Sequence, residues 1–477
     1  MKKNDLSPEA FRFEGKMSLK QALPLGMQHV LAMFVGNLTP LLIITGACGL
    51  AGGEFADLRV TLLQNAMLVA GIVTLVQLYS IGPIGGKVPI IMGTSSGFIG
   101  VFSSVTASMG GGVLAYGAIM GASLIGGLFE TVLGFFLKPL RKLLPSVVTG
   151  TVVLSIGLSL ISVGVNSFGG GNTAQDFGSV ENLLLAIFVL VVILICKHSG
   201  STFLNSSSIL VGIICGYIVA FLMGLVLPTT ALNAEGVAYT KAWVLNWNKV
   251  AEAKWFALPE LMPVKPVFDM RAIAPVMIMF IVTAVETVGD ISGVIMGGMD
   301  REATDTELSG GVICDGIGSS FAALFGVLPN TSFSQNVGLV SMTKVVNRKV
   351  ILSGGLILVL ASFVPAIAEV FNSLPQAVLG GCTIMMFGNI ILSGFQMIAE
   401  AGFTQRNITI AALSLTIGIG FTQVSDIFTQ FPALFQQIFA SNCIAVAFVV
   451  AVILNTVLPS EEHFLSAPKE APAADAE

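Results

Sequence analysis

The chain has 477 residues, of which 54% are hydrophobic and 10% are charged, and its mean hydropathy is +0.90. Soluble domains carry about 25% charged residues, so this chain has too few to cover a water-facing surface. A net charge of −5 with scattered basic residues gives no support to nucleic-acid binding. The composition therefore predicts a protein embedded in a lipid bilayer.

The six cysteines lie in or beside apolar runs and form no Cys-x-x-Cys pair. This pattern favours apolar packing over a disulfide framework or a zinc site, and no metal site is expected. The polar, basic N-terminus is followed by an apolar run that is too long for a signal peptide. It is predicted to be a cytoplasmic leader that precedes the first span.

Helical spans need about 20 apolar residues, and twelve apolar runs are interpreted as spans. They are Leu23–Cys48, Val60–Ile81, Val113–Leu137, Val147–Val165, Leu183–Cys196, Ile209–Leu227, Ala272–Val294, Gly310–Leu328, Val350–Phe371, Ala377–Ile398, Ile408–Phe421 and Ile438–Leu458. Two more segments, Gly82–Val105 and Pro329–Val345, are broken by Pro, Gly or polar residues. The sequence thus predicts an all-α polytopic membrane protein with fourteen transmembrane segments.

Basic residues indicate the orientation of these spans. With the N-terminus in the cytoplasm, only six of the 22 Lys and Arg residues lie outside, and five of the six belong to one long loop. Both termini are therefore predicted on the cytoplasmic side of the inner membrane. The predicted organisation is a leader over residues 1–21, seven spans over 22–227, an extracytoplasmic loop over 228–271, seven spans over 272–458 and a disordered cytoplasmic tail over 459–477.

The two broken segments each take the third place in a seven-span half. Because each half has an odd number of spans, the halves are predicted to be inverted repeats. Non-helical backbone at membrane depth survives where it lines a cavity or is buried in protein. The pair therefore predicts the binding site of a transporter. The alternative is two Pro and Gly kinks that share these positions by chance.

Few ionisable side chains fall inside the spans, where they are costly and usually functional. They are His29, Glu130, Glu286, Asp290 and Asp315, with Glu369 at a span edge. Glu286 and Asp290 are four residues apart and share one helix face, where repulsion and desolvation favour a proton on at least one of them, as proton coupling requires. The alternative for each is a hydrogen bond to a facing Ser or Thr. For His29 the alternative is plain packing, and Glu130, near a span end, is assigned a structural role.

The segment from Asn330 to Gly338 has the sequence Asn-Thr-Ser-Phe-Ser-Gln-Asn-Val-Gly. The amides of Gln335 and Asn336 each offer donors and an acceptor, and a helix that begins here adds a partial positive charge. Such a segment matches the edge of a flat, uncharged or weakly acidic heterocycle. The alternative is a polar loop that only caps the next helix.

Residues Gln335 to Lys344, Gln-Asn-Val-Gly-Leu-Val-Ser-Met-Thr-Lys, match the signature Q/E/P-N-x-G-x-x-x-x-T-K/R/G of the nucleobase–ascorbate transporter family at every fixed position. Further matches in the family's order are Gln28-His29, Glu286 with Gly289-Asp290, and Asp315-Gly316. The chain resembles this family over essentially its whole length. Glutamine at the first motif position resembles the xanthine and uric-acid branch.

The resemblance implies a fold of two inverted seven-span repeats. Spans one to four and eight to eleven would form a core domain and the others a gate domain, with short strands in spans three and ten. The substrate-binding residues would be Glu286, Gln335, Ser96, Phe98 and Phe333. Residues that support the site or couple it to protons would be His29, Asp315, Asn336 and Asp290. The resemblance also implies a homodimer and a co-transported H⁺ or Na⁺, with no other cofactor.

The resulting prediction is a proton-coupled symporter that imports xanthine or uric acid. Alternatives are a guanine/hypoxanthine or uracil permease of the same family, and an anion transporter or channel of the related fold of sulfate carriers. Those carriers usually have a C-terminal cytoplasmic domain, for which this tail is short. A membrane enzyme is disfavoured because no metal cluster or nucleophile–base pair is evident. One departure from the family pattern, Gly97 between Ser96 and Phe98, leaves open which backbone groups meet the base.

Overall fold

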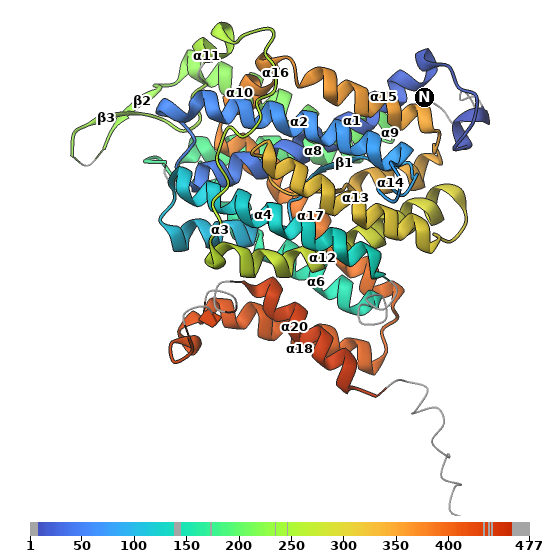
Figure 1. Ribbon diagram of the computed structural model, residues 1–477. Helices are drawn as coiled ribbons and strands as arrows, with labels where there is room; N and C mark the ends of the chain where they lie inside the picture. The colour runs from blue at the N-terminus through green and yellow to red at the C-terminus, as the bar shows by residue number, and fades with distance from the viewer. Residues whose placement is uncertain are drawn as a thin grey trace, which may run out of the picture.

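The computed structural model describes residues 8–137, 145–171, 174–233, 235–245, 247–432, 435–436, 439 and 442–459. Helices dominate it, and most of them lie side by side across the view of Figure 1. The predicted leader is described from Pro8 onward. The predicted tail, beyond Pro459, lies outside the described residues.

Eight of the described helices are long and apolar enough to cross a membrane, when α6 and α7 are taken as one. They are α1 (Leu19–Ala47), α2 (Ala56–Tyr79), α4 (Gly112–Phe135), α6 (Ser146–Ser159) with α7 (Ile161–Phe168), α8 (Val180–Lys197), α10 (Ser208–Val226), α12 (Met270–Met299) and α17 (Gln376–Glu400). A ninth span is present if α15 (Arg348–Ala361) and α16 (Pro365–Asn372) count as one. The remaining α-helices are α3 (Ile99–Met109), α9 (Thr202–Ser206), α11 (Trp247–Glu252), α13 (Asp305–Leu324), α14 (Ser334–Thr343), α18 (Gln405–Gln423) and α20 (Cys443–Val457).

The run Val350–Phe371, predicted as one span, is not a single straight helix. α15 and α16 are bent by 82° at the short break between them. Pro365 is the first residue of α16, and its ring removes a backbone donor at that point. The carbonyl of Phe363 accepts a hydrogen bond from the backbone N–H of Ala257, in the outer loop, at 3.1 Å. Hydropathy alone does not reveal a break that is held by a distant loop.

Two short strands from opposite halves of the chain meet inside the helical bundle. β1 (Met92–Thr94) pairs antiparallel with β4 (Asn330–Ser332), with Met92 opposite Ser332 and Thr94 opposite Asn330. All six residues are buried. Each strand is followed by a helix, α3 or α14, so both broken segments leave the meeting point as helices.

The strands are anchored to the helices that precede them. Thr74 on α2 accepts a hydrogen bond from the Met92 N–H at 2.9 Å. Ser319 on α13 accepts one from the Asn330 N–H at 3.0 Å and donates to the carbonyl of the same residue. Asn37 on α1 accepts from the Thr94 N–H at 2.8 Å. Backbone groups that no helix satisfies are therefore paired within the bundle.

α4 and α13 pack with their backbones almost in contact. A Cβ on Gly127 would lie 2.5 Å from the Gly316 carbonyl oxygen, and one on Gly316 would lie 2.4 Å from the Thr131 nitrogen. Small residues permit such close approach in membrane bundles. The contact holds α13 in place at Asp315, the residue before Gly316.

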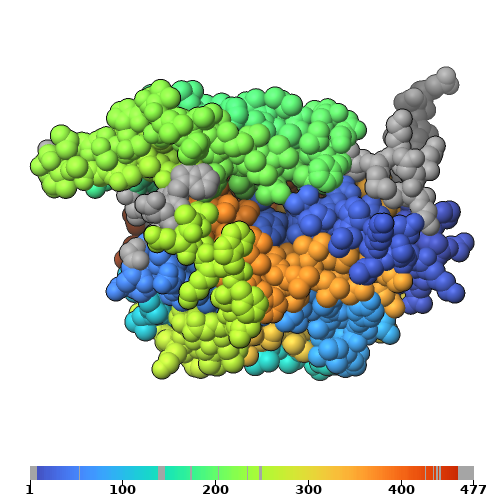
Figure 2. Space-filling model, turned by 90° about the horizontal axis from the view of Figure 1, so that it is seen from above, coloured from blue at the N-terminus to red at the C-terminus, as the bar shows by residue number. Residues whose placement is uncertain are grey.

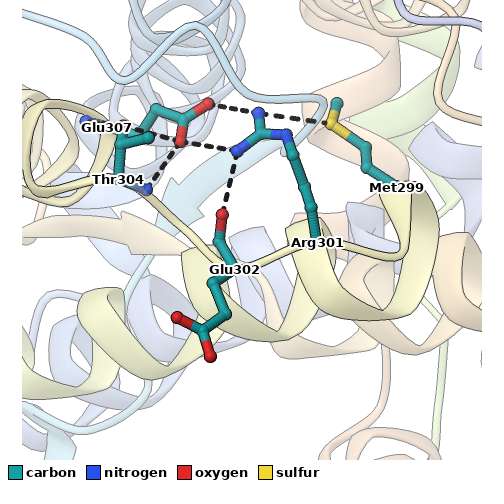
Figure 3. Close-up of polar contacts among 5 residues, drawn as sticks. All are labelled: Met299, Arg301, Glu302, Thr304 and Glu307. Atoms are coloured by element: carbon teal, nitrogen blue, oxygen red, sulfur yellow. Dashed lines mark hydrogen bonds and ion pairs between the residues drawn. The ribbon is translucent and has the colours of Figure 1, made fainter.

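The turn between α12 and α13 is closed by charged side chains (Figure 3). Thr304 caps α13, and Glu307 accepts a hydrogen bond from the Thr304 backbone in a capping box. Arg301 donates to both carboxylate oxygens of Glu307, at 2.9 and 2.5 Å. The turn fixes the relative position of the two helices that carry Glu286 and Asp315.

The loop between α10 and α12 begins with a hairpin of β2 (Thr230–Leu232) and β3 (Ala238–Thr240). The hairpin projects beyond the helices in both Figure 1 and Figure 2. Lys241, directly after β3, forms a 2.7 Å ion pair with Glu181 near the start of α8. This contact ties the base of the hairpin to the bundle.

Candidate functional site

A cavity of about 320 Å³ lies where the strands meet the helices. One wall comes from the turn after β1 and from β4, α12 and α14, and it includes Ser96, Gly97, Glu286, Thr331, Ser332, Phe333, Ser334 and Gln335. A second wall comes mainly from α8, α9, α10 and α17, and it includes Lys197, Asn205, Ser206, Asn389, Ser393 and Gln396. Four of the five predicted substrate-binding residues therefore line one cavity.

Glu286 and Gln335 bring a carboxylate and an amide to this cavity from neighbouring elements. Glu286 lies in the middle of α12, and its buried Oε2 atom has no hydrogen-bond partner among the described residues. Gln335 is the second residue of α14, where the start of the helix adds a partial positive charge. Phe333, the extended residue before α14, covers the cavity beside them. The arrangement offers both donors and acceptors to a bound molecule.

Asp290, one helical turn after Glu286, faces serine hydroxyls. The hydroxyl of Ser332 donates to Asp290 at 2.6 Å and that of Ser334 at 2.9 Å. Both serines also line the cavity. Asp290 thus has the Ser partners of the alternative interpretation, and it holds the end of β4 against α12.

Asp315 is the eleventh residue of α13 and is fully buried. The predicted span Gly310–Leu328 puts Asp315 near its start, but α13 begins earlier, at Asp305, with a polar turn that the hydropathy pattern leaves out, so Asp315 lies in the middle of the helix. Asp315 accepts hydrogen bonds from the hydroxyls of Thr287 on α12 and Thr331 in β4. Thr331 lines the cavity, so Asp315 is one side chain away from it.

His29 and Asn336 form a buried contact behind the cavity. The Asn336 amide nitrogen lies 3.0 Å from His29 Nδ1 and donates to the His29 carbonyl at 3.0 Å. The pair joins α1 to the first turn of α14, directly after Gln335. Neither residue is among those that line the cavity. Both are placed to support Gln335 rather than to touch a bound molecule.

Ser96 and Gly97 line the cavity, whereas Phe98 does not. The Phe98 ring is fully buried and packs against Phe102 and Phe280, with ring centroids 5.3 and 4.8 Å away. In this structure the Phe98 ring therefore lies outside the cavity lining, and its contact with substrate stays a prediction. The backbone turn at Ser96 and Gly97 takes that place in the wall.

Glu130 on α4 is fully buried and accepts a hydrogen bond from Thr283 at 3.1 Å. Thr283 lies one turn before Thr287, so α12 meets Glu130 and Asp315 along one side. Of the ion pairs among the described residues, none involves Glu130, Glu286, Asp290 or Asp315. Glu130, Asp290 and Asp315 are thus held by hydroxyl groups and not by fixed cations.

The polar residues of the second wall were missed by sequence reasoning. Asn389, Ser393 and Gln396 recur at the spacing of one helix face, and this polar stripe within the apolar run Ala377–Ile398 is the signal that identifies them. Lys197 directly follows the predicted span Leu183–Cys196, and hydropathy alone leaves it outside the span. The structure makes it the last residue of α8 and a cavity residue.

A bundle of apolar spans around a cavity that carries a carboxylate, amides and hydroxyl groups is typical of a membrane transporter. The chain matches the model of the Permease family (Xan_ur_permease) over residues 20–427. It is 31% identical to "Xanthine permease XanP" of Escherichia coli (strain K12) over 463 residues, 95% of each chain. It is 34% identical to "Uric acid permease PucJ" of Bacillus subtilis (strain 168) over 472 residues, covering 94% of this chain and 98% of that protein.

Among solved structures, the transmembrane domain of the cyanobacterium bicarbonate transporter BicA has a similar fold, with a TM-score of 0.58 and 16% identity. That similarity covers 92% of this chain and 97% of the other. The chain belongs to the permease family of nucleobase–ascorbate transporters. It is therefore a multi-pass membrane transporter and not an enzyme.

Proposed function

We propose that this protein is a secondary active transporter that imports an oxidised purine, xanthine or uric acid, across the inner membrane together with protons. The observation that carries the proposal is the convergence of Glu286 and Gln335 on one cavity. The names of its relatives, which include xanthine and uric acid permeases, support the same substrate class.

The chemistry of the two side chains suits an oxidised purine. Xanthine alternates N–H donors and C=O acceptors along its edge, and the Gln335 amide matches one of each. The Glu286 carboxylate accepts from a ring N–H, and a hydrogen bond to a charged group is stronger than a neutral one. The cavity volume of about 320 Å³ lies at the lower end of the range of small-molecule sites, as a compact bicyclic base requires.

Proton coupling is assigned to the carboxylates around the cavity. Symport requires the proton and the substrate to be bound together, so while Glu286 accepts a hydrogen bond from the substrate N–H, the proton is assigned to a neighbouring carboxyl group. Asp290 and Asp315 contact cavity-lining hydroxyl groups, so protonation of either changes how those hydroxyls are held. Coupling to Na⁺ is the alternative.

The proposed topology has fourteen crossings in two inverted seven-span repeats, with cytoplasmic termini, core and gate domains, and assembly as a homodimer. β1 and β4 support the repeats, because each lies in the third predicted segment of its half and the two pair antiparallel. The cavity supports the two domains, because residues of both the predicted core spans and the predicted gate spans line it.

Uptake of radiolabelled purines by cells that express the chain, with and without a protonophore, tests the proposal. We expect saturable uptake of xanthine or uric acid that collapses when the proton gradient is removed. Uptake that requires Na⁺ and resists the protonophore would show that the coupling ion is Na⁺ and not H⁺. Uptake of guanine, hypoxanthine or uracil, without uptake of xanthine or uric acid, would contradict the proposed substrate. Transport of inorganic anions without purines would favour the sulfate-carrier type of function.

A further inference from the structure

Lys197 places a positive charge in the lining of the cavity that Glu286 also lines. It is the last residue of α8 and is half-buried. Its Nζ atom donates to Asn389 Oδ1, on α17, at 3.1 Å, and both residues line the cavity. Among the described residues that line this cavity, Lys197 is the one basic side chain and Glu286 the one acidic side chain.

The surroundings of Lys197 are polar in a segment where lipid-facing residues are apolar. Asn389, Ser393 and Gln396 present one polar face of α17 to the cavity. Ser206, from α9, adds a hydroxyl that accepts a hydrogen bond from Gln28 at 3.0 Å. A lysine at a helix end often only extends to the membrane surface. Here the hydrogen bond to Asn389 directs the ammonium group to the cavity instead.

The two charges act differently on neutral and anionic purines. Uric acid loses a ring proton below neutral pH and is a monoanion in mildly acidic solution, where xanthine and hypoxanthine are largely neutral. An anionic purine is repelled by the Glu286 carboxylate and attracted by the Lys197 ammonium group, whereas a neutral purine meets little net effect from either. A cavity that takes uric acid therefore benefits from a cation in its lining.

We propose that Lys197, positioned by Asn389, selects for the anionic oxidised purine, the urate monoanion, over neutral purines in this cavity. The inference rests on the proposed purine transport. It assigns a specificity role to the second wall of the cavity, because Glu286 and Gln335 are assigned to the hydrogen-bonding edge of the base and carry no positive charge.

The test compares wild type, Lys197→Gln and Lys197→Arg in a competition experiment in mildly acidic solution. Uptake of a labelled transported purine is inhibited by unlabelled uric acid or by unlabelled hypoxanthine and xanthine. We expect Lys197→Gln to raise the uric acid concentration for half-inhibition about five- to tenfold, the effect of losing one partly solvated opposite charge. Inhibition by the neutral purines should change by less than about twofold. Lys197→Arg should keep the wild-type preference.

Lys20→Gln is the matched control, because Lys20 is exposed in the first turn of α1 and does not line the cavity. The amount of each variant in the membrane is measured so that a loss of insertion is not mistaken for a loss of affinity. Equal changes for uric acid and neutral purines, no change for uric acid, or no inhibition of the wild type by uric acid would each overturn the inference. A wild type that takes up no purine at all would instead refute the proposed function, and this inference with it.

Discussion

β1 and β4 are held alike at their backbones and differently at their side chains. Thr74 on α2 and Ser319 on α13 each hydrogen-bond the N–H and the carbonyl of one strand residue, Met92 in β1 and Asn330 in β4. In both cases the hydroxyl group belongs to the helix that precedes the strand. It satisfies backbone groups that would otherwise be unpaired at membrane depth.

The side chains around the two strands differ in charge. Next to β1, the contact is made by the neutral amide of Asn37. Next to β4, the hydroxyls of Thr331 and Ser332 reach the carboxylates of Asp315 and Asp290. The first half of the chain therefore supplies a neutral scaffold, and the second half supplies the ionisable groups. Loss of a partner should cost more in the second half, because hydrogen bonds to charged groups are the stronger ones.

The largest effect is expected for Glu286→Gln. The change removes the charged acceptor and leaves a substrate N–H poorly paired, which costs about 1–3 kcal/mol. Uptake should fall at least about tenfold while the protein still inserts. Glu302→Gln, in the exposed turn of Figure 3, is the matched control and should transport normally. Wild-type uptake by a well-expressed Glu286→Gln variant would show that Glu286 is not part of the substrate site.

Asp315→Asn should reduce turnover more than substrate binding, because Asp315 acts through Thr287 and Thr331 and does not line the cavity. Replacing an acceptor of two hydroxyl hydrogen bonds costs about 1–3 kcal/mol. We expect the maximal rate to fall about tenfold while KM changes less than about threefold. Initial-rate uptake over a range of substrate concentrations separates the two. A higher KM with an unchanged maximal rate would instead indicate that Asp315 contacts the base.

Gln335 tests whether the edge of the base is read by an amide. A carboxylate only accepts hydrogen bonds, so Gln335→Glu should impair uptake of oxidised purines and admit bases with a different donor pattern. Gln335→Asn keeps the chemistry but is one methylene shorter, and it should weaken affinity without changing preference. A panel of purines and pyrimidines competing with labelled substrate measures both. An inhibition profile unchanged in both variants would assign specificity to other residues, such as Ser96 and Gly97.

Thr74→Val and Ser319→Ala compare the two backbone anchors directly. Each removes one hydroxyl that serves a strand N–H, so each should lower the free energy of unfolding by about 1–3 kcal/mol. Melting temperatures in one detergent measure the two side by side. Similar losses would support equivalent anchors. A much larger loss of unfolding free energy for Thr74→Val would show that the strand anchor in the neutral first half contributes more to stability than the one in the second half.

The smallest effect is expected for Glu307→Gln. Because Glu307 lies outside the cavity, the pH dependence of its effect on stability can be tested separately from transport. Partial burial raises the pKa of Glu307, but hydrogen bonds from Arg301 and Thr304 outweigh it, and the pKa lies below its ordinary value. A lowered pKa stabilises the folded state above the ordinary carboxyl pKa, and this stabilisation is lost as the pH falls through the folded-state value. Glu307→Gln should cost about 0.5 kcal/mol at neutral pH, since the pair is partly exposed. The difference in melting temperature from wild type should vanish on acidification; a constant difference would refute the assignment.

Sequence reasoning predicts the site best where chemistry and pattern coincide. Gln335 and Glu286 stand out because polar groups are rare in apolar spans, and the structure brings both to one cavity. The broken segments stand out because Pro and Gly interrupt hydropathy, and they contain β1 and β4. Such local signals do not show which segments of the chain pair with each other.

The differences arise where a side chain's direction depends on packing. Phe98 follows a polar turn like a cavity residue, but Phe102 and Phe280 bury its ring on the other side. Lys197 ends an apolar run like an ordinary loop cation, and only the position of α17 brings it to the cavity. The bend before Pro365 likewise depends on a loop contact made about 100 residues away along the chain. Hydropathy and spacing carry none of this information.

The pairing of β1 with β4 also has a consequence for synthesis of the protein in the membrane. Met92 and Ser332 are 240 residues apart in the chain, so β1 is made long before its partner strand. Thr74 and Asn37 are already present and can bind two of its N–H groups. The remaining backbone groups have no partner until β4 is inserted, and an unpaired group in lipid costs several kcal/mol. A nascent chain that ends before Asn330 therefore has an open strand edge inside the bilayer, and it depends on water or on the insertion machinery to shield that edge.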